Sequence, residues 1–189
     1  MLLRSALIAL TVLWPLSEIA LAMACRGRGR DATARDAGSL RGIWLSVAIG
    51  IPLAILGSGL RRAGFGIPES TQVLIALVLL VVGLTIRWSA IVTLGRFFTV
   101  NVAIQSGHQV VREGPFRFVR HPSYLGAMLC MFGVGVAFGN WISLAAATIP
   151  YTIAILRRIE VEERVLVEAL GDAYREYART TRRLLPGVY

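Results

Sequence analysis

The stretch that decides the fold is residues 122–156, PSYLGAMLCMFGVGVAFGNWISLAAATIPYTIAIL, which contains no charged side chain. A helix rises about 1.5 Å per residue, so roughly 20 residues cross a hydrocarbon core about 30 Å thick, and this run is too long for one crossing. Gly139 and Asn140 divide the run near its middle, and this pair of residues favours a turn. We therefore predict a hairpin of two short membrane helices, at residues 123–138 and 141–156.

Three further apolar runs precede the hairpin, at residues 2–24, 43–60 and 71–94. Each has about the length of one membrane crossing, so the sequence predicts an all-α integral membrane protein with about five transmembrane helices. The first run also resembles a signal peptide, because residues 22–25 (AMAC) contain the small residues of a cleavage site and faintly match a lipoprotein processing site. The length of this run and the spans that follow it favour a retained helix.

The composition excludes several other classes of protein. The chain has 189 residues, of which 56% are hydrophobic and 16% charged, and its mean hydropathy is +0.65. Intrinsic disorder requires low hydrophobicity, and a disulfide scaffold requires more than the two cysteines present. The net charge of +9 could suit a nucleic acid. However, the arginines flank apolar runs, which favours membrane topology and contact with anionic lipid headgroups, and no nucleic-acid partner.

The distribution of arginine between the loops predicts the orientation of the chain. The loop at residues 26–41 has five arginines and the turn of the hairpin has none, whereas arginines are frequent after residue 94. Because basic loops stay in the cytoplasm, we expect the N-terminus outside a bacterial-type inner membrane and the polar segments after residue 94 inside. Residues 157–189 are expected to form a cytoplasmic amphipathic helix, interrupted at Gly171, and a short tail.

Arg87 lies within the third predicted span, where leucine or valine would insert more favourably. A charge at membrane depth costs roughly 2.5–3.5 kcal/mol, so such a residue usually faces a partner or a wet cavity. Arg87 is also only seven residues from Leu94 at the cytoplasmic end, so its side chain could instead extend to the headgroups. The position of Arg87 leaves both interpretations open.

Residues 114–124, GPFRFVRHPSY, join this span to the hairpin. The His-Pro pair disfavours helical geometry at His121, and Pro122 suits the first position of the next helix. The backbone N–H groups at such a helix start are unpaired and can bind a ligand. The same residue types also form arginine-rich turns with aromatic anchors at membrane interfaces.

Residues 157–164, RRIEVEER, begin where the second helix of the hairpin is expected to end. Arg158 and Glu162 are four residues apart and therefore share one helix face, close to the membrane surface. A run of this kind can also be only a solvated, charged face. The two histidines and two cysteines are scattered without the spacing of metal ligands, so no metal site is predicted.

Taken in this order, these pieces resemble the isoprenylcysteine carboxyl methyltransferase family. The matching text is RHPSYLG at residues 120–126, then Glu162 and Glu163 with Leu166, then GDAYREY at residues 171–177, and finally Pro186. The similarity extends from about Arg87 to Pro186. No single piece is decisive, but the ordered set is specific.

The resemblance implies a membrane enzyme that transfers a methyl group from S-adenosylmethionine to a carboxylate on a lipid-like substrate. It implies one domain, with three N-terminal transmembrane helices in residues 1–94 and the cofactor-binding catalytic region in residues 95–189. It implies that Arg87 and Arg158 are the catalytic residues that bind the reacting end of the substrate. It places Glu162, Tyr174 and Tyr177 next to the residues that contact the ligands, as supports for those residues. The implied cofactor-binding residues are His108, Gln109, Val110, Val111, Phe116, His121, Pro122, Ser123, Tyr124 and Glu163, the last accepting hydrogen bonds from the cofactor's ammonium.

The sequence departs from the family pattern at Phe116, where the family usually has tyrosine, and Gln105 is a further candidate contact. Three kinds of function remain open. The protein could methylate a prenylated cysteine or another lipophilic acid, or it could methylate a lipid amine, a thiol or another small hydrophobic acceptor. It could also be a non-enzymatic membrane protein that keeps the fold. Arg87 and Arg158 favour an anionic acceptor, because cations repel an amine headgroup. Membrane lipids are expected partners, and the sequence does not indicate an oligomeric state.

Overall fold

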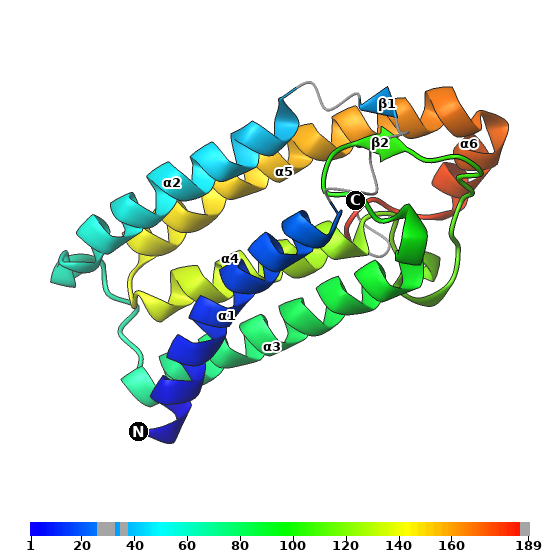
Figure 1. Ribbon diagram of the computed structural model, residues 1–189. Coiled ribbons are helices and arrows are strands. Elements are labelled where there is room, and N and C mark those ends of the chain that lie inside the picture. Colours follow the sequence, from blue (N-terminus) through cyan, green and yellow to red (C-terminus); the bar gives the residue numbers. More distant parts are fainter. Residues whose placement is uncertain (26–32, 35–37, 186–189) are drawn as a thin grey trace.

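The computed structural model describes residues 1–25, 33–34 and 38–185, and it is mostly helical (Figure 1). The predicted all-α class is therefore confirmed, apart from a two-residue antiparallel ladder between β1 (Thr33–Ala34) and β2 (Ala103–Ile104). Most of the expected loop at residues 26–41, and Pro186, lie outside the described residues. The α-helices are α1 (Leu2–Cys25), α2 (Ser39–Ser58), α3 (Glu69–Leu94), α4 (Pro122–Ala137), α5 (Trp141–Leu170) and α6 (Asp172–Thr180). The shorter elements are η1 (Arg61–Ala63), η2 (Gly95–Phe97), η3 (Gly114–Arg117), β1 (Thr33–Ala34) and β2 (Ala103–Ile104).

Four of the described helices, α1, α2, α3 and α5, are long and apolar enough to cross a membrane. These include the three predicted N-terminal spans. The α4 helix is also apolar but has only 16 residues, about 24 Å at 1.5 Å per residue. The count of five spans depends on whether α4 crosses the membrane, and it remains a prediction.

The predicted hairpin is present as α4 and α5, joined at Gly139 and Asn140. Gly139 has a φ of 80°, which favours glycine. The side chain of Asn140 caps α5 by accepting a hydrogen bond from the backbone N–H of Ser143 at 2.7 Å. The expected end of the second helix at residue 156 is wrong, because α5 continues to Leu170. Polarity changes at Arg157, but arginine, glutamate and leucine all favour helix, so nothing stops the helix before Gly171.

The long helices form a bundle in which α2 lies along α5 and α4 lies between α3 and α5, with α1 against α3 (Figure 1). Glycines allow α3 and α4 to approach closely. A Cβ atom on Gly126 would lie 2.5 Å from the carbonyl oxygen of Gly83 and 2.6 Å from the backbone nitrogen of Arg87. This close approach places Arg87 beside the first turn of α4.

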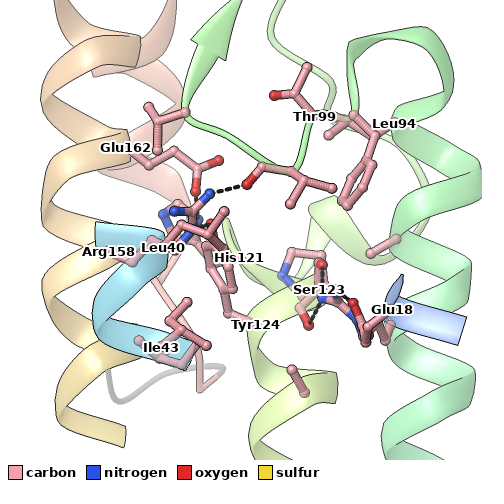
Figure 2. Close-up of a pocket in the computed structure, with 18 of the residues that line it drawn as sticks. Glu18, Leu40, Ile43, Leu94, Thr99, His121, Ser123, Tyr124, Arg158 and Glu162 are labelled. Atoms are coloured by element: carbon pink, nitrogen blue, oxygen red, sulfur yellow. Dashed lines mark hydrogen bonds and ion pairs between the residues drawn. The ribbon is translucent and has the colours of Figure 1, made fainter. Parts of the chain in front are cut away.

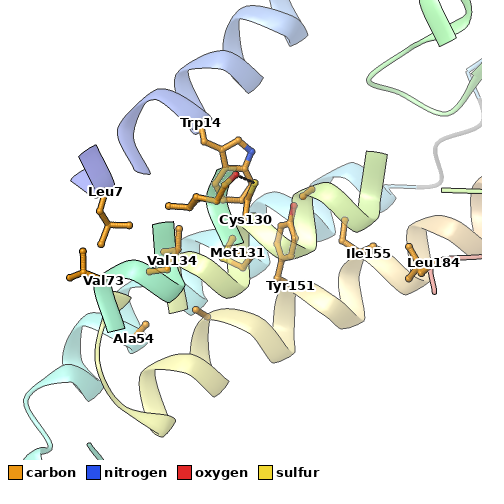
Figure 3. Close-up of a cluster of buried hydrophobic side chains, with 14 of the residues drawn as sticks. Leu7, Trp14, Ala54, Val73, Cys130, Met131, Val134, Tyr151, Ile155 and Leu184 are labelled. Atoms are coloured by element: carbon orange, nitrogen blue, oxygen red, sulfur yellow. Dashed lines mark hydrogen bonds between the residues drawn. The ribbon is translucent and has the colours of Figure 1, made fainter. Parts of the chain in front are cut away.

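The apolar core runs along the bundle. Figure 3 shows Cys130 and Met131 of α4 in this core, together with Trp14 of α1 and Tyr151 and Ile155 of α5. Strand β2, η3 and α6 gather at one end of the bundle (Figure 1). The polar segments that the sequence singled out are thereby brought to one end of the helices.

Candidate active site

A cavity of about 670 Å³ lies at this end of the bundle and extends between the helices. Its polar end is lined by His108, Glu162 and Tyr174. Apolar residues such as Met131 of α4 and Phe138, directly after the end of α4, line it farther along the bundle. This volume lies within the usual range of small-molecule sites.

The structure brings the site residues predicted from the sequence to this cavity, with the exceptions of Glu163 and the further candidate Gln105. Glu163 does not line it, and Gln105 lines a smaller hollow with Arg96 and Leu21. The predicted residues that line the cavity are Arg87, His108, Gln109, Val110, Val111, Phe116, His121, Pro122, Ser123, Tyr124, Arg158, Glu162, Tyr174 and Tyr177.

The carboxylate of Glu163 is taken up by a cluster of basic side chains. It accepts hydrogen bonds from Nε of Arg120 at 2.8 Å and from Nε of Arg183 at 2.9 Å, and it lies 3.3 Å from Nε2 of His121. The backbone of the same segment is fixed as well, because the N–H groups of Arg120 and His121 donate to the carbonyls of Arg182 and Arg183 at 2.7 and 3.0 Å. Glu163 therefore positions the Arg-His-Pro turn, and the cofactor contact that we expected from it stays a prediction.

The neighbouring carboxylate, Glu162, faces the cavity (Figure 2). Among the described residues, its buried Oε2 atom has no hydrogen-bond partner, and neither do Nδ1 of His108 and the hydroxyl of Tyr174. Nδ1 of His121 lies 3.9 Å from Oε2 of Glu162, which is too long for a hydrogen bond. Buried polar atoms are nearly always paired, so three unpaired ones along one cavity indicate a polar ligand.

Burial also shifts the pKa values of two of these groups. It lowers the pKa of His108 below the usual value of 6.5, although the Glu162 carboxylate acts in the opposite direction. Burial, followed by the carboxylates of Glu163 and Glu162, raises the pKa of Tyr174 above its usual value of 10. His108 is therefore neutral at pH 7, and Tyr174 keeps its proton and can donate it in a hydrogen bond.

Arg158, only 3% exposed, ties the wall of the cavity together. Its Nε donates to the hydroxyl of Tyr124 at 2.7 Å and its Nη1 to Oγ of Ser39 at 2.9 Å. Its Nη2 donates to the carbonyl of Val100. One guanidinium thus joins α5 to α4, to α2 and to the segment before β2.

Arg87 does not extend to the headgroups but lies inside the bundle, with an 11% exposed side chain. Its Nη1 donates to Oγ of Ser123 at 2.8 Å and to the carbonyl of Ser123 at 3.3 Å. Its Nε and Nη2 donate to the two carboxylate oxygens of Glu18 in α1. Nε1 of Trp14 donates to the same carboxylate at 3.1 Å. Figure 2 shows Ser123 and Glu18 together on the side of the cavity opposite Arg158 and Glu162.

Sequence reasoning missed Glu18 as the partner of Arg87. The signal was present, because Glu18 is the only acidic residue within the predicted spans. A charge at membrane depth requires a partner, so the lone acidic and the lone deep basic residue form an expected pair.

The chain is similar to one family of known proteins and to several curated relatives. The model of the "Isoprenylcysteine carboxyl methyltransferase (ICMT) family" matches residues 74–168, which is half of the chain. A "Probable protein-S-isoprenylcysteine O-methyltransferase" of Oryza sativa subsp. indica is 33% identical over 116 residues, or 60% of this chain and 61% of the relative. A "Protein-S-isoprenylcysteine O-methyltransferase" of Schizosaccharomyces pombe is 30% identical over 156 residues, or 76% of this chain and 66% of the relative.

A more distant relative has a different name. The "Methanethiol S-methyltransferase 1" of Bradyrhizobium diazoefficiens is 38% identical over 71 residues, which cover 38% of this chain and 24% of the relative. The chain spans about three fifths of the length of the plant relatives that it matches, 61% for the Oryza protein and 58% for "Protein-S-isoprenylcysteine O-methyltransferase A" of Arabidopsis thaliana.

Proposed function

Since the chain belongs to the isoprenylcysteine carboxyl methyltransferase family, we propose that it is a membrane methyltransferase that uses S-adenosylmethionine. The proposed acceptor is the carboxylate of an isoprenylcysteine or a similar lipophilic acid. One observation carries this proposal: a single cavity has three unpaired polar atoms at one end and an apolar lining at the other. Both halves of the chain line this cavity, so residues 1–94 contribute to the site as well as residues 95–189.

The polar end of the cavity fits the methyl donor. S-adenosylmethionine carries an ammonium, a carboxylate, hydroxyls and a base, and when bound it supplies an electrophilic methyl group on a sulfonium. Glu162 would accept hydrogen bonds from the ammonium, and Tyr174 and His108 can pair with further polar groups. The remaining proposed cofactor-binding residues are Gln109, Val110, Val111, Phe116, His121, Pro122, Ser123 and Tyr124.

The apolar end of the cavity suits a long hydrocarbon chain. Its lining follows α4 from Ser123 to Phe138 at the C-cap, fifteen positions apart in the sequence and about 22 Å at 1.5 Å per residue. The walls on the other sides include Val47 and Ile51 of α2 and Tyr151 of α5. An isoprenoid tail can lie here while its polar end stays beside Arg87.

Methyl transfer to a carboxylate requires little from the protein beyond alignment of the two reactants. A carboxylate is ionised at pH 7, so it can attack the methyl carbon without a general base. Holding the two reactants in line and excluding water can supply much of the acceleration. We propose that Arg87 orients the acceptor and that Arg158, through Tyr124 and Ser39, keeps the cavity wall in place.

A thiol acceptor is the second candidate, because of two observations. One is the similarity to the methanethiol methyltransferase. The other is that the Arg87 guanidinium is already neutralised by Glu18, which lessens the preference for an anion that Arg87 alone would give. A thiol has a pKa near 8.5 and would have to lose its proton before or during methyl transfer.

The test is a methylation assay in liposomes that contain the full-length protein. Labelled S-adenosylmethionine is offered with acetyl-farnesylcysteine, a phospholipid amine or a hydrophobic thiol. We expect transfer to the farnesylcysteine, with a label that base hydrolysis releases as methanol. Transfer to the thiol alone would favour the second candidate, and a folded protein that methylates none of the three would contradict both.

We further propose that the chain lies in a bacterial-type inner membrane with its N-terminus outside and this cavity open to the cytoplasm.

A further inference from the structure

The Glu18 carboxylate occupies the position where Arg87 would hold an acidic ligand. The Nε and Nη2 atoms of Arg87 bind its two oxygens, the paired arrangement in which a guanidinium holds a carboxylate most strongly. Glu18, Arg87, Trp14 and Ser123 all line the cavity. An acidic acceptor can therefore reach the Arg87 fork only by replacing Glu18.

We propose that Glu18 is a specificity-determining residue that closes the acceptor-carboxylate position until an acidic acceptor displaces it. The Glu18–Arg87 pair forms again after the acceptor has been esterified. This inference rests on the proposed function and names a device that selects its substrate and releases its product. Glu18 lies in α1, outside the residues that match the family model.

Glu18 is the partner of Arg87 that can move. Ser123, on the other side of the guanidinium, belongs to α4, which packs tightly against α3 at Gly83 and Gly126. The α1 helix is held more loosely, because Leu7, Trp14 and Cys25 are its only buried residues. The Glu18 side chain is 22% exposed, against 11% for Arg87.

Charge explains why the exchange selects an acid. If a neutral group displaced Glu18, the Arg87 guanidinium would be left buried without a counter-charge, which is strongly unfavourable. An acceptor carboxylate restores the pair. In the reaction its oxygen bonds to the methyl carbon of S-adenosylmethionine, and the methyl–sulfur bond breaks with its electrons remaining on sulfur. The ester formed has no charge, so Glu18 can reclaim Arg87 and expel the product.

The experiment measures equilibrium binding of acetyl-farnesylcysteine and of its methyl ester to the full-length protein in detergent. Glu18→Gln keeps the size of the side chain and an acceptor for Trp14 but removes the competing charge. We expect the acid to bind Glu18→Gln about tenfold more tightly than it binds the parent protein, because close charge pairs have coupling energies of this order or more. The ester has no charge to pair with Arg87, so it should gain much less affinity than the acid.

Glu69→Gln is the matched control. Glu69 forms an ion pair with Arg4 and also joins α1 to α3, but this pair is exposed and does not line the cavity. We expect both ligands to bind Glu69→Gln as they bind the parent. The double variant Glu18→Gln with Arg87→Gln should lose the preference for the acid, and it guards against instability caused by an unpaired Arg87.

Equal or weaker binding of the acid to Glu18→Gln would overturn the proposal, as would an acid preference that persists in the double variant. Binding of S-adenosylhomocysteine to the same samples separates this inference from the function on which it rests. If that ligand binds and the acid gains nothing in Glu18→Gln, only the role of Glu18 is wrong. If neither that ligand nor the acid binds any variant, the proposed function is wrong as well.

Discussion

Replacing the neighbouring carboxylates Glu162 and Glu163 by glutamine should have opposite effects. Glu163→Gln should lower stability, and Glu162→Gln should lower the affinity for the cofactor. The Glu163 side chain is 13% exposed. It forms ion pairs with Nε of Arg120 at 2.8 Å and with Nη2 of Arg183 at 2.8 Å. Removing one partner of a buried pair costs roughly 3–5 kcal/mol. Because the Arg183 side chain is 31% exposed, water offsets part of this loss, and we expect about 3 kcal/mol for Glu163→Gln.

For a chain of this size, 1 kcal/mol corresponds to roughly 2–4 °C in melting temperature, so Glu163→Gln should melt about 6–12 °C lower. Its affinity for S-adenosylhomocysteine below that temperature should change much less. Glu162→Gln should behave in the reverse manner. Its Oε2 atom has no hydrogen-bond partner among the described residues, so the melting temperature should stay within about a degree of the parent value.

The ligand affinity of Glu162→Gln should fall strongly. A hydrogen bond to a charged group is worth roughly 1.5–3 kcal/mol, so the Kd for S-adenosylhomocysteine should rise about tenfold or more. Differential scanning fluorimetry and calorimetry on the purified variants measure both effects. Glu160→Gln is the control, because Glu160 is exposed on the same helix and does not line the cavity. Small, equal effects from Glu162→Gln and Glu163→Gln would mean that the run is only a solvated face, and the opposite pattern would return the cofactor contact to Glu163.

Three further predictions follow from the packing and the charges. Gly126→Ala should lower the free energy of unfolding by about 1–3 kcal/mol, because its Cβ would meet the backbone of Gly83, whereas Gly42→Ala in α2 has open space and should be neutral or slightly stabilising in the same melts. Arg158→Lys cannot reach Tyr124, Ser39 and Val100 together, so it should lower the melting temperature measurably, and a melt equal to that of the parent would show that these contacts contribute nothing. The lowered pKa of His108 means that the unfolded chain binds a proton below pH 6.5 that the folded chain does not. Stability should therefore fall as the pH drops through that value, and this fall should be shallower in His108→Gln.

The hairpin was predictable from the sequence because its two determinants are local. A charge-free run too long for one crossing contains a single Gly-Asn turn signal, and the structure turns there. The continuation of α5 beyond Leu156 was not predicted, since the change from apolar to charged residues marks a solvent boundary rather than the end of a helix. Gly171, which has a φ of 55°, is the actual stop.

The proposal of Glu162 rather than Glu163 as the cofactor contact comes from the structure, in which these adjacent residues point about 100° apart around the helix. The spacing did contain a clue. Arg158 and Glu162 are four residues apart and share one face, and both line the cavity. The Glu18–Arg87 pair was indicated by the lone acidic residue within the predicted spans, although neither apolar run specifies how α1 packs against α3.

The measurement that tests a methyl-donor site in this cavity most directly is calorimetric titration of the full-length protein with S-adenosylhomocysteine in detergent. We expect saturable binding at one site per chain, together with a rise in melting temperature that depends on ligand concentration. If a folded sample at high ligand concentration shows neither binding heat nor a thermal shift, the assignment of this cavity to the methyl donor is contradicted.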